Sequence, residues 1–307
     1  MATSQTAPQA APRSKPSGLP AALGAYVIWG FMPLYLLLVT AVPPFEFVGW
    51  RIIWTLPFCL LFVALRKQFP ALRAAIGNPR TMLALLASAI LIAINWFVYI
   101  WAIMENEVYA ASLGYYLNPL LNVLLGTLLL KERLSKWQWL AVAIAGSAVA
   151  LLAAGALTTL WISLTLALSF GMYGIVRKQV AVGSLPGLTI ESAILLLPAA
   201  GIVWWYAQSS AGSTFGVDPV LSATIAFSGL VTAVPLLMFA IAAKRMEYST
   251  LGFIQYLAPT IVFILGLTIF GQELKPAQLG SFLLIWTAVA IFVADLWAKS
   301  RQAKGTA

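Results

Sequence analysis

The chain has 307 residues, of which 62% are hydrophobic and only 9% are charged. Soluble globular domains carry about 25% charged residues, so this balance excludes an ordinary soluble domain and indicates an integral membrane protein. The formal net charge is +9. The basic residues lie in short segments between apolar runs instead of on one face, which argues against nucleic-acid binding.

The predicted elements are a tail, ten membrane-spanning helices and a second tail. Residues 1–20 are rich in Ala, Pro, Ser and Thr, which predicts a disordered cytoplasmic tail. Crossing a hydrocarbon core takes about 20 apolar residues, and the runs are continuous instead of alternating, so they predict an all-α integral membrane fold. The ten spans are 21–40, 46–65, 80–102, 110–130, 136–154, 158–177, 188–208, 221–243, 249–270 and 276–297. Residues 298–307 follow as a cytoplasmic tail.

The basic residues predict the orientation of these spans. With a cytoplasmic N-terminus, sixteen of the eighteen Lys and Arg residues fall in inside segments. The exceptions are Arg51, within a span, and Lys275, outside. The positive-inside rule therefore favours ten helices with both termini in the cytoplasm.

Two spans, the fourth and the ninth, are similar in sequence, and both carry a central proline. In the fourth, polar or small residues three or four apart share one helix face: Ser112, Tyr115, Pro119, Asn122 and Gly126. The positions 140 residues later are Gly252, Gln255, Pro259, Val262 and Gly266. Each repeat holds five spans, an odd number, so the copies at 21–154 and 155–297 cross in opposite senses. Such an inverted repeat predicts a site near the midplane and alternating access to it.

Several segments resemble a known family. They are AYVIWG at 25–30, INWFVYIWA at 94–102, ASLGYYLNPLLNVLLGTLLLKERL at 111–134, FGMYGIVRK at 170–178 and STLGFIQYLAP at 249–259. In order and spacing they resemble the drug/metabolite transporter superfamily, in particular its EamA-type exporters and their RarD-like branch. The resemblance implies a multi-pass protein of the bacterial inner membrane, with ten helices in an inverted repeat and cytoplasmic termini. It also implies transport of small organic solutes such as amino acids or related metabolites.

The family often ends its fourth and ninth helices with Gly-Glu. Here those positions read Lys131-Glu132 and Gly271-Gln272, with Glu273 one place further on.

Polar and aromatic residues inside the spans are the candidates for substrate binding. Facing lipid would be costly for the amides, so they are expected inside the bundle, either bonding between helices or binding substrate. Trp29 in the first span and Tyr173 in the sixth occupy equivalent positions of the two repeats. Most other aromatic residues are expected in the belts at the two membrane–water interfaces. The predicted substrate-binding residues are Trp29, Asn95, Tyr99, Tyr115, Asn118, Tyr173, Gln255 and Tyr256.

Pro119 and Pro259 are predicted hinges. A mid-helix proline removes a backbone donor and kinks the chain. The repeat favours a functional hinge over a merely tolerated kink, and places the two prolines facing each other across the transport path.

Arg51 and Glu191 are the charges placed clearly within spans, where ionisable residues are functional hypotheses by default. Both are expected only about 5 to 8 Å deep, because a helix rises 1.5 Å per residue. Their helices start on opposite sides, so no direct salt bridge is expected. Glu191 in a first turn would also suit the helix dipole. Arg51 is either an outer gate, an anchor for a substrate carboxylate, or a snorkelling side chain.

No metal or cofactor is predicted, because the chain has no His and a single cysteine, Cys59. Coupling by an imidazole relay is excluded, so any proton coupling uses Glu191 or another carboxylate. An intramembrane enzyme is disfavoured, because the spans contain no carboxylate pair and no His. The leading hypothesis is an exporter of small amphipathic metabolites that works as a monomer or homodimer in the lipid bilayer. The alternatives are an uncoupled facilitator or importer and a non-transporting scaffold.

Overall fold

The computed structural model describes residues 17–154, 157–271, 273 and 276–305, and within these every regular element is a helix. Residues 1–16 of the predicted tail at 1–20 lie outside the described residues, and the first helix already begins at Leu19. The helices are α1 Leu19–Leu36, α2 Pro44–Leu65, α3 Phe69–Ile76, α4 Pro79–Met104, α5 Val108–Leu128, α6 Lys136–Ala153, α7 Leu160–Gln179, α8 Ser184–Ala207, α9 Pro219–Arg245, α10 Tyr248–Gln255, α11 Leu257–Thr268 and α12 Pro276–Gly305. Short 3₁₀ turns at Leu37–Val39 and Leu157–Thr159 precede α2 and α7.

The fold class is confirmed as an all-α integral membrane fold. Within the described residues, nine spans are long and apolar enough to cross a bilayer, with α10 and α11 together forming one of them. The 21-residue α5 is not among the nine. It carries Asn118, Pro119 and Asn122 in its middle, which lower its hydropathy. With α5 the spans number ten, and this count stays a prediction.

Three boundaries differ from the prediction in ways that matter. α2 begins at Pro44 and α8 at Ser184, earlier than the predicted 46 and 188. The ninth span is broken after Gln255, so Pro259 lies in the first turn of α11 and not at mid-helix as predicted. A proline is tolerated in a first turn, where its missing N–H would have no helical partner.

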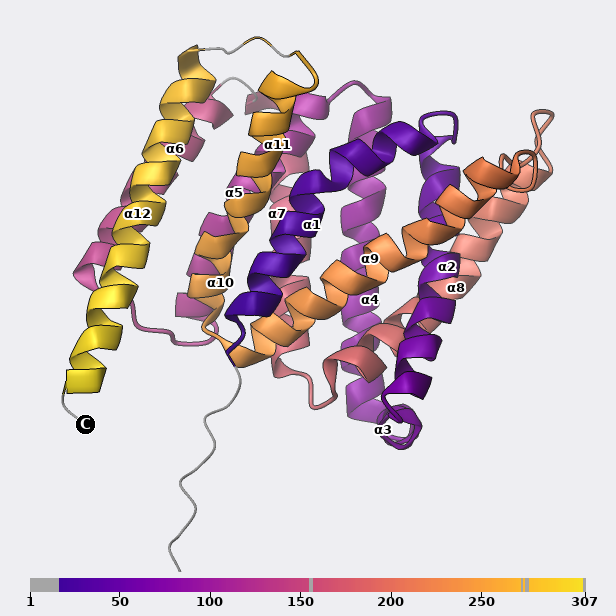
Figure 1. Cartoon of the computed structure of the whole chain (residues 1–307), viewed down its shortest axis with the longest axis horizontal. Coiled ribbons are helices and arrows are strands. Elements are labelled where there is room, and N and C mark those ends of the chain that lie inside the picture. Colours follow the sequence, from indigo (N-terminus) through magenta and orange to yellow (C-terminus); the bar gives the residue numbers. More distant parts are fainter. Residues whose placement is uncertain (1–16, 155–156, 272, 274–275, 306–307) are drawn as a thin grey trace, which may run out of the picture.

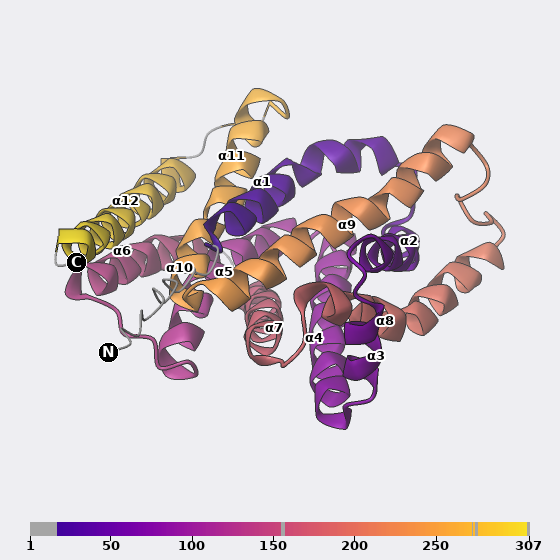
Figure 2. The same ribbon diagram turned by 60° about the horizontal axis from the view of Figure 1, so that its bottom comes forward.

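A short helix, α3, lies in the segment predicted as a plain loop. It is eight residues long, too short to span, and its sequence FPALRAAI is amphipathic. Leu72 and Ala75 pack against Leu85 of α4 and Ile190 of α8. The helix therefore lies against the end of the bundle, where Figures 1 and 2 both place it next to α4 and α8.

Most helices pack against the other predicted half or against their own counterpart in it, so that matching helices of the two halves have matching partners. α1 packs on α9 and α11, and its counterpart α7 packs on α4 and α5. The remaining counterparts pack on each other: α2 on α8, α5 on α10, and α6 on α12. Figures 1 and 2 show the α6–α12 pair along one side of the molecule. Such an exchange is expected of two repeats related by a two-fold axis.

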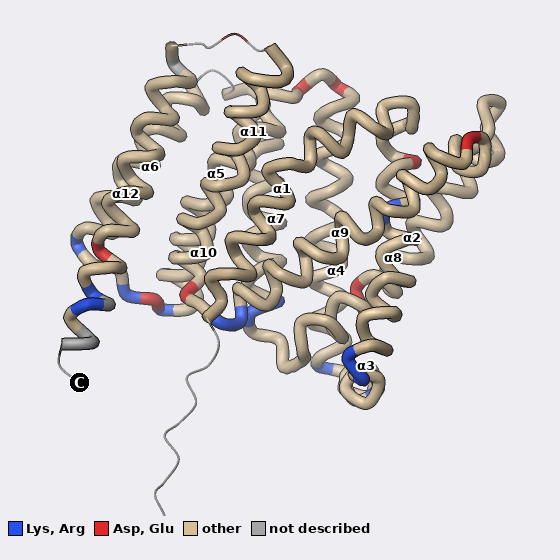
Figure 3. The backbone as a smooth tube through the Cα atoms, in the orientation of Figure 1, with Lys and Arg blue, Asp and Glu red and all other residues tan. Residues whose placement is uncertain are grey.

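Charged residues separate between the two ends of the bundle. Figure 3 shows most Lys and Arg residues near the end where α1 begins and α12 finishes, whereas acidic residues mark the loops at the opposite end. We call these the inner and outer ends, following the positive-inside rule.

Candidate substrate site

A small cavity lies where α2 and α4 meet α7, α8 and α9. Its volume is about 10 Å³, room for about one water molecule. Most of its lining is apolar, and the polar or aromatic members are Thr55, Trp96, Tyr173, Glu191 and Ser192. Because its walls come from both predicted halves, the cavity has the position expected of a transport site.

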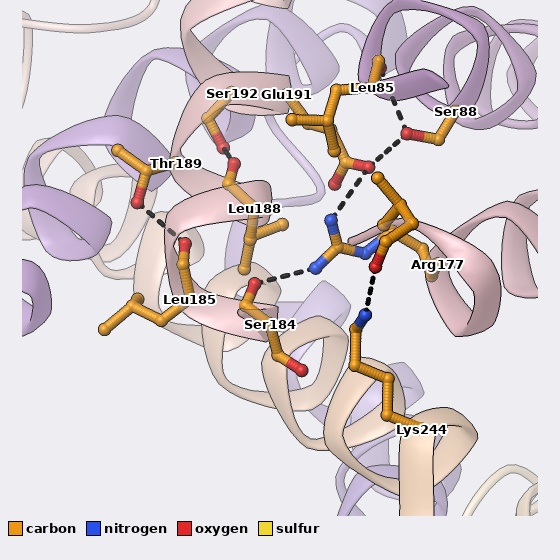
Figure 4. Close-up of polar contacts among 11 residues, drawn as sticks. Leu85, Ser88, Arg177, Ser184, Leu185, Leu188, Thr189, Glu191, Ser192 and Lys244 are labelled. Atoms are coloured by element: carbon orange, nitrogen blue, oxygen red, sulfur yellow. Dashed lines mark hydrogen bonds and ion pairs between the residues drawn. The ribbon is translucent and has the colours of Figure 1, made fainter. Parts of the chain in front are cut away.

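Glu191 is buried beside this cavity and is bonded to both halves. Its Oε1 accepts hydrogen bonds from the Ser88 hydroxyl of α4 and, at 3.3 Å, from Nη1 of Arg177 in α7 (Figure 4). Nη2 of Arg177 donates to the Ser184 carbonyl at 2.7 Å. Glu191 is 2% exposed and Arg177 is 0% exposed. The second carboxylate oxygen of Glu191 has no partner in the described chain.

The placement of Glu191 and Arg177 corrects two predictions. Arg177, assigned to the inner loop, is buried and forms an ion pair with Glu191. Because α8 begins at Ser184, Glu191 lies seven residues into the helix, about 10 Å deep and beyond the first turn. The helix-dipole interpretation of Glu191 is therefore wrong, since that effect fades within one turn. Gly187 makes the pair feasible: a Cβ there would lie 2.1 Å from Nη1 of Arg177.

Arg51 lies in a group of aromatic rings, which we call the Arg51 cage, formed by Phe47, Trp96, Tyr99 and Tyr115. Its guanidinium carbon is 5.2 Å from the Trp96 ring centroid and 5.8 Å from that of Phe47. Tyr99 and Tyr115 pack edge to face at 5.8 Å, and both interact electrostatically with Arg51. Trp96 belongs to the cage and also lines the cavity.

The guanidinium of Arg51 is only partly satisfied. Nε donates to Thr232 Oγ1 of α9 at 3.1 Å. In the described part of the chain, its Nη groups have no hydrogen-bond partner and no carboxylate pairs with it. Like Glu191, Arg51 is seven residues into its helix, about 10 Å deep and deeper than predicted.

The amides of the fourth and ninth spans bond between helices. Nδ2 of Asn122 donates to Oε1 of Gln255 at 2.7 Å, joining α5 to α10. Asn118 is 4% exposed, and its Oδ1 has no partner within the described residues. A Cβ on Gly252 would lie 2.7 Å from the Pro119 carbonyl oxygen. At this level α10 therefore lies directly against α5, and a path between Pro119 and Pro259 stays a prediction.

Trp29, Asn95 and Tyr256 lie outside the cavity and the Arg51 cage. The Trp29 ring is 5.9 Å from Phe239, the residue that Tyr173 also contacts, at 6.1 Å. Asn95 holds α4 to α7 by donating to the Leu166 carbonyl at 2.8 Å. Tyr256 packs in a separate cluster against α6 and α12. The structure thus brings together Tyr173 and Glu191 in the cavity and Arg51, Tyr99 and Tyr115 in the cage.

Sequence reasoning missed Ser88, Arg177 and Thr232. The signal that could have found two of them is helical spacing. Arg177 is four residues after Tyr173, and Ser88 is eight before Trp96, so each shares a helix face with a cavity residue. Nothing in the sequence indicated Thr232.

The long apolar helices and the buried charges inside the bundle are those of a multi-pass membrane protein. Residues 16–154 match the model of the EamA-like transporter family. The chain is 42% identical to an uncharacterized transporter of Pseudomonas aeruginosa over 93% of this chain and 96% of the relative. It is 41% identical to the protein RarD of Escherichia coli over 94% and 97%. A crystal structure with 19% identity superposes with a TM-score of 0.70 over 90% of this chain and 96% of the other, and supports the fold.

The chain belongs to the EamA-like transporter family and is RarD-like. It is a multi-pass protein of the bacterial inner membrane, as its helices and its relatives show. The expected membership in the drug/metabolite transporter superfamily is confirmed.

Proposed function

We propose that the protein is a secondary transporter that exports small amphipathic metabolites, such as amino-acid-like solutes or drugs, by alternating access through a site between its two halves. The observation that carries the proposal is Arg51. It is an intramembrane cation without an anionic partner in the described chain, next to a cavity with walls from both halves.

The chemistry of the Arg51 cage fits such a solute. The free Nη groups can bind a carboxylate with two charge-assisted hydrogen bonds. The faces of Trp96 and Tyr99 offer apolar area for the rest of the molecule. Trp96 also borders the cavity toward Glu191, so a solute that moves outward passes the cavity first and then meets Arg51.

The described conformation is closed toward the inner end. Side chains there pack without exposure, among them Ala22, Tyr26, Phe239 and Tyr248. A cavity of about 10 Å³ is too small for an amino acid. Transport by alternating access would therefore require the halves to move apart at the inner end before a solute could load from the cytoplasm.

Counterflow in proteoliposomes tests the proposal. We expect the wild-type chain to exchange at least one radiolabelled amino acid from a broad panel, and efflux from preloaded cells to show the outward direction. If no solute of the panel exchanges, the substrate class is wrong.

Substitution of Arg51 tests the role of the cage. Arg51→Gln should reduce exchange of carboxylate-bearing solutes by roughly ten- to hundredfold, because a hydrogen bond to a charged group contributes about 1.5–3 kcal/mol. Arg51→Lys should be intermediate, since it keeps the charge and loses the planar fork. The matched control is Arg73→Gln on α3, an exposed arginine that should leave exchange unchanged. Wild-type exchange by Arg51→Gln would remove Arg51 from the site.

A further inference from the structure

The pair of Glu191 and Arg177 is unusual because it is buried and incompletely bonded. Both hydrogen bonds to the carboxylate converge on Oε1, while Oε2 has none within the described residues; Nε of Arg177 has none there either. A buried ion pair compensates its loss of hydration only when its remaining polar atoms are satisfied. A purely stabilising role therefore does not explain why this pair is buried. Ionisable residues in membrane helices are commonly functional.

The two donors to Glu191 come from different halves. Arg177 belongs to α7 and is fixed in the same half as Glu191 by its bond to the Ser184 carbonyl and by the space at Gly187. Ser88 belongs to α4 in the other half. If the halves separate, Glu191 keeps Arg177 and loses Ser88, while water gains access to its oxygens.

We propose that Glu191 is a proton-binding site whose occupancy controls the contact between α4 and α8. In the closed state Glu191 is buried, which disfavours the charged form, so the neutral carboxylic acid is held against Ser88 and Arg177 keeps its charge and its bond to Ser184. In the open state water hydrates the carboxyl group, its proton passes to that water, and the resulting carboxylate pairs with Arg177. Resting on the proposed transport function, this step would link proton movement to the alternation between the two sides.

No other carboxylate within the described residues faces Glu191. The titratable groups near it are Arg177 and Tyr173 of α7 and Cys59 of α2. Lys244 of α9 lies beyond Arg177 and donates to the Val180 carbonyl at 2.6 Å (Figure 4).

On the remaining packed elements, α4 contributes the uncharged Ser88, and Arg73 of α3 is exposed. Tyr and Cys are neutral near pH 7 at their ordinary pKa values of about 10 and 8.5. Glu191 is therefore the group that can take up a proton here.

The single cysteine of the chain is a built-in reporter of this opening. Cys59 lies beside Glu191 and Ser192 and is fully buried. Opening the contact between α4 and α8 should admit a small thiol reagent. We would measure the rate at which N-ethylmaleimide labels Cys59 in the full chain, and divide it by the rate for glutathione at the same pH to remove the intrinsic dependence of thiol reactivity.

The expected direction follows from mass action. The open state binds one proton fewer than the closed state, so its population rises as the pH rises, by at most about tenfold per pH unit. The normalised labelling of the wild type should increase roughly three- to tenfold between about pH 6 and about pH 8. Glu191→Gln, which resembles the protonated acid, should label slowly at both values. The control Glu105→Gln, at an exposed outer-loop carboxylate, should behave as the wild type.

A second variant covers the case in which Glu191→Gln fails to fold. Ser88→Ala removes the hydrogen-bond partner from the opposite half and leaves Arg177 in place, so it should label faster than the wild type at about pH 6 and remain pH-dependent. The proposal is overturned if labelling of the wild type does not depend on pH, or if Ser88→Ala labels at the wild-type rate. The measurement needs no solute, so a failure of counterflow and a failure of this test are separate results.

Discussion

At the scale of single residues, the turn after α5 explains a departure from the family pattern. Lys131 has a φ of 56° and Gly271 has a φ of 61°. Each is the third residue after the end of its helix, α5 or α11, and the two are 140 residues apart, the offset of the repeat. A positive φ is costly for a residue with a Cβ and free for Gly. The Gly of the family pattern thus allows the positive φ that this turn requires. Lys131 has the same positive φ and is strained by its Cβ.

Lys131→Gly is therefore expected to stabilise the protein. Relief of the left-handed strain is worth about 1–2 kcal/mol, partly offset by the greater freedom of Gly in the unfolded chain, so we expect a net gain of about 0.5–1 kcal/mol. The measurement is the midpoint of thermal unfolding in detergent. Arg133→Gly, in the same segment but without a positive φ, is the control and should lower the midpoint. A lower midpoint for Lys131→Gly would show that Lys131 makes contacts that outweigh the strain.

At the scale of elements, two carboxylates join the halves at opposite ends. Glu132, after α5, accepts from the Tyr248 and Ser249 amides at 2.6 and 2.8 Å and so caps the N-terminus of α10. At the outer end, Glu46 of α2 is fully buried and accepts from the Thr214 amide at 2.9 Å, in the connection between α8 and α9. A carboxylate at a helix N-terminus also interacts favourably with the helix dipole. The Glu132 contact must break if α5 and α10 separate at the inner end.

The close approach of α5 and α10 depends on Gly252. Because a Cβ there would meet the Pro119 backbone at 2.7 Å, Gly252→Ala must push the helices apart, at a cost of about 1–3 kcal/mol for overpacking. Thermal unfolding in detergent measures the loss. Gly146→Ala in α6 is the matched control: nothing lies within 4 Å of its Cβ, so it should be neutral or stabilising. Equal midpoints for the two variants would mean that α5 and α10 are not in tight contact.

Much of this arrangement followed from the sequence, and the failures have physical reasons. Long apolar runs predict membrane helices because hydrocarbon requires every backbone group to be bonded internally. The match with Trp29 across the repeat indicated Tyr173, and a charge within a span indicated Glu191. Such signals cannot decide which interior residues touch, because Arg177 reaches Glu191 only through the space that Gly187 leaves on another helix. Likewise, Pro259 indicated a disruption but not its position, since the chain breaks at Gln255 and Tyr256 to suit the packing of α10 on α5.

At the scale of the whole molecule, the helix packing and the distribution of charged residues both agree with the predicted membrane topology. The exchange of packing partners agrees with two repeats related by a two-fold axis, as predicted from the sequence. The Lys and Arg residues, which gather at one end in Figure 3, predict that this end is cytoplasmic. The two signals are independent, because one depends on helix contacts and the other on loop composition. An odd number of crossings in each half is the prediction that agrees with both.

The sidedness can be measured directly with engineered cysteines, because the native Cys59 is buried. We expect a membrane-impermeant maleimide to label Glu105→Cys, in the outer loop between α4 and α5, in cells whose outer membrane has been permeabilised. Arg133→Cys and Arg301→Cys, at the inner end, should be labelled only after the inner membrane is also disrupted. Labelling of Arg301→Cys in intact spheroplasts would place the end of α12 outside and leave an odd number of crossings between it and a cytoplasmic α1. That result would contradict the ten-span count even though the helices themselves are correct.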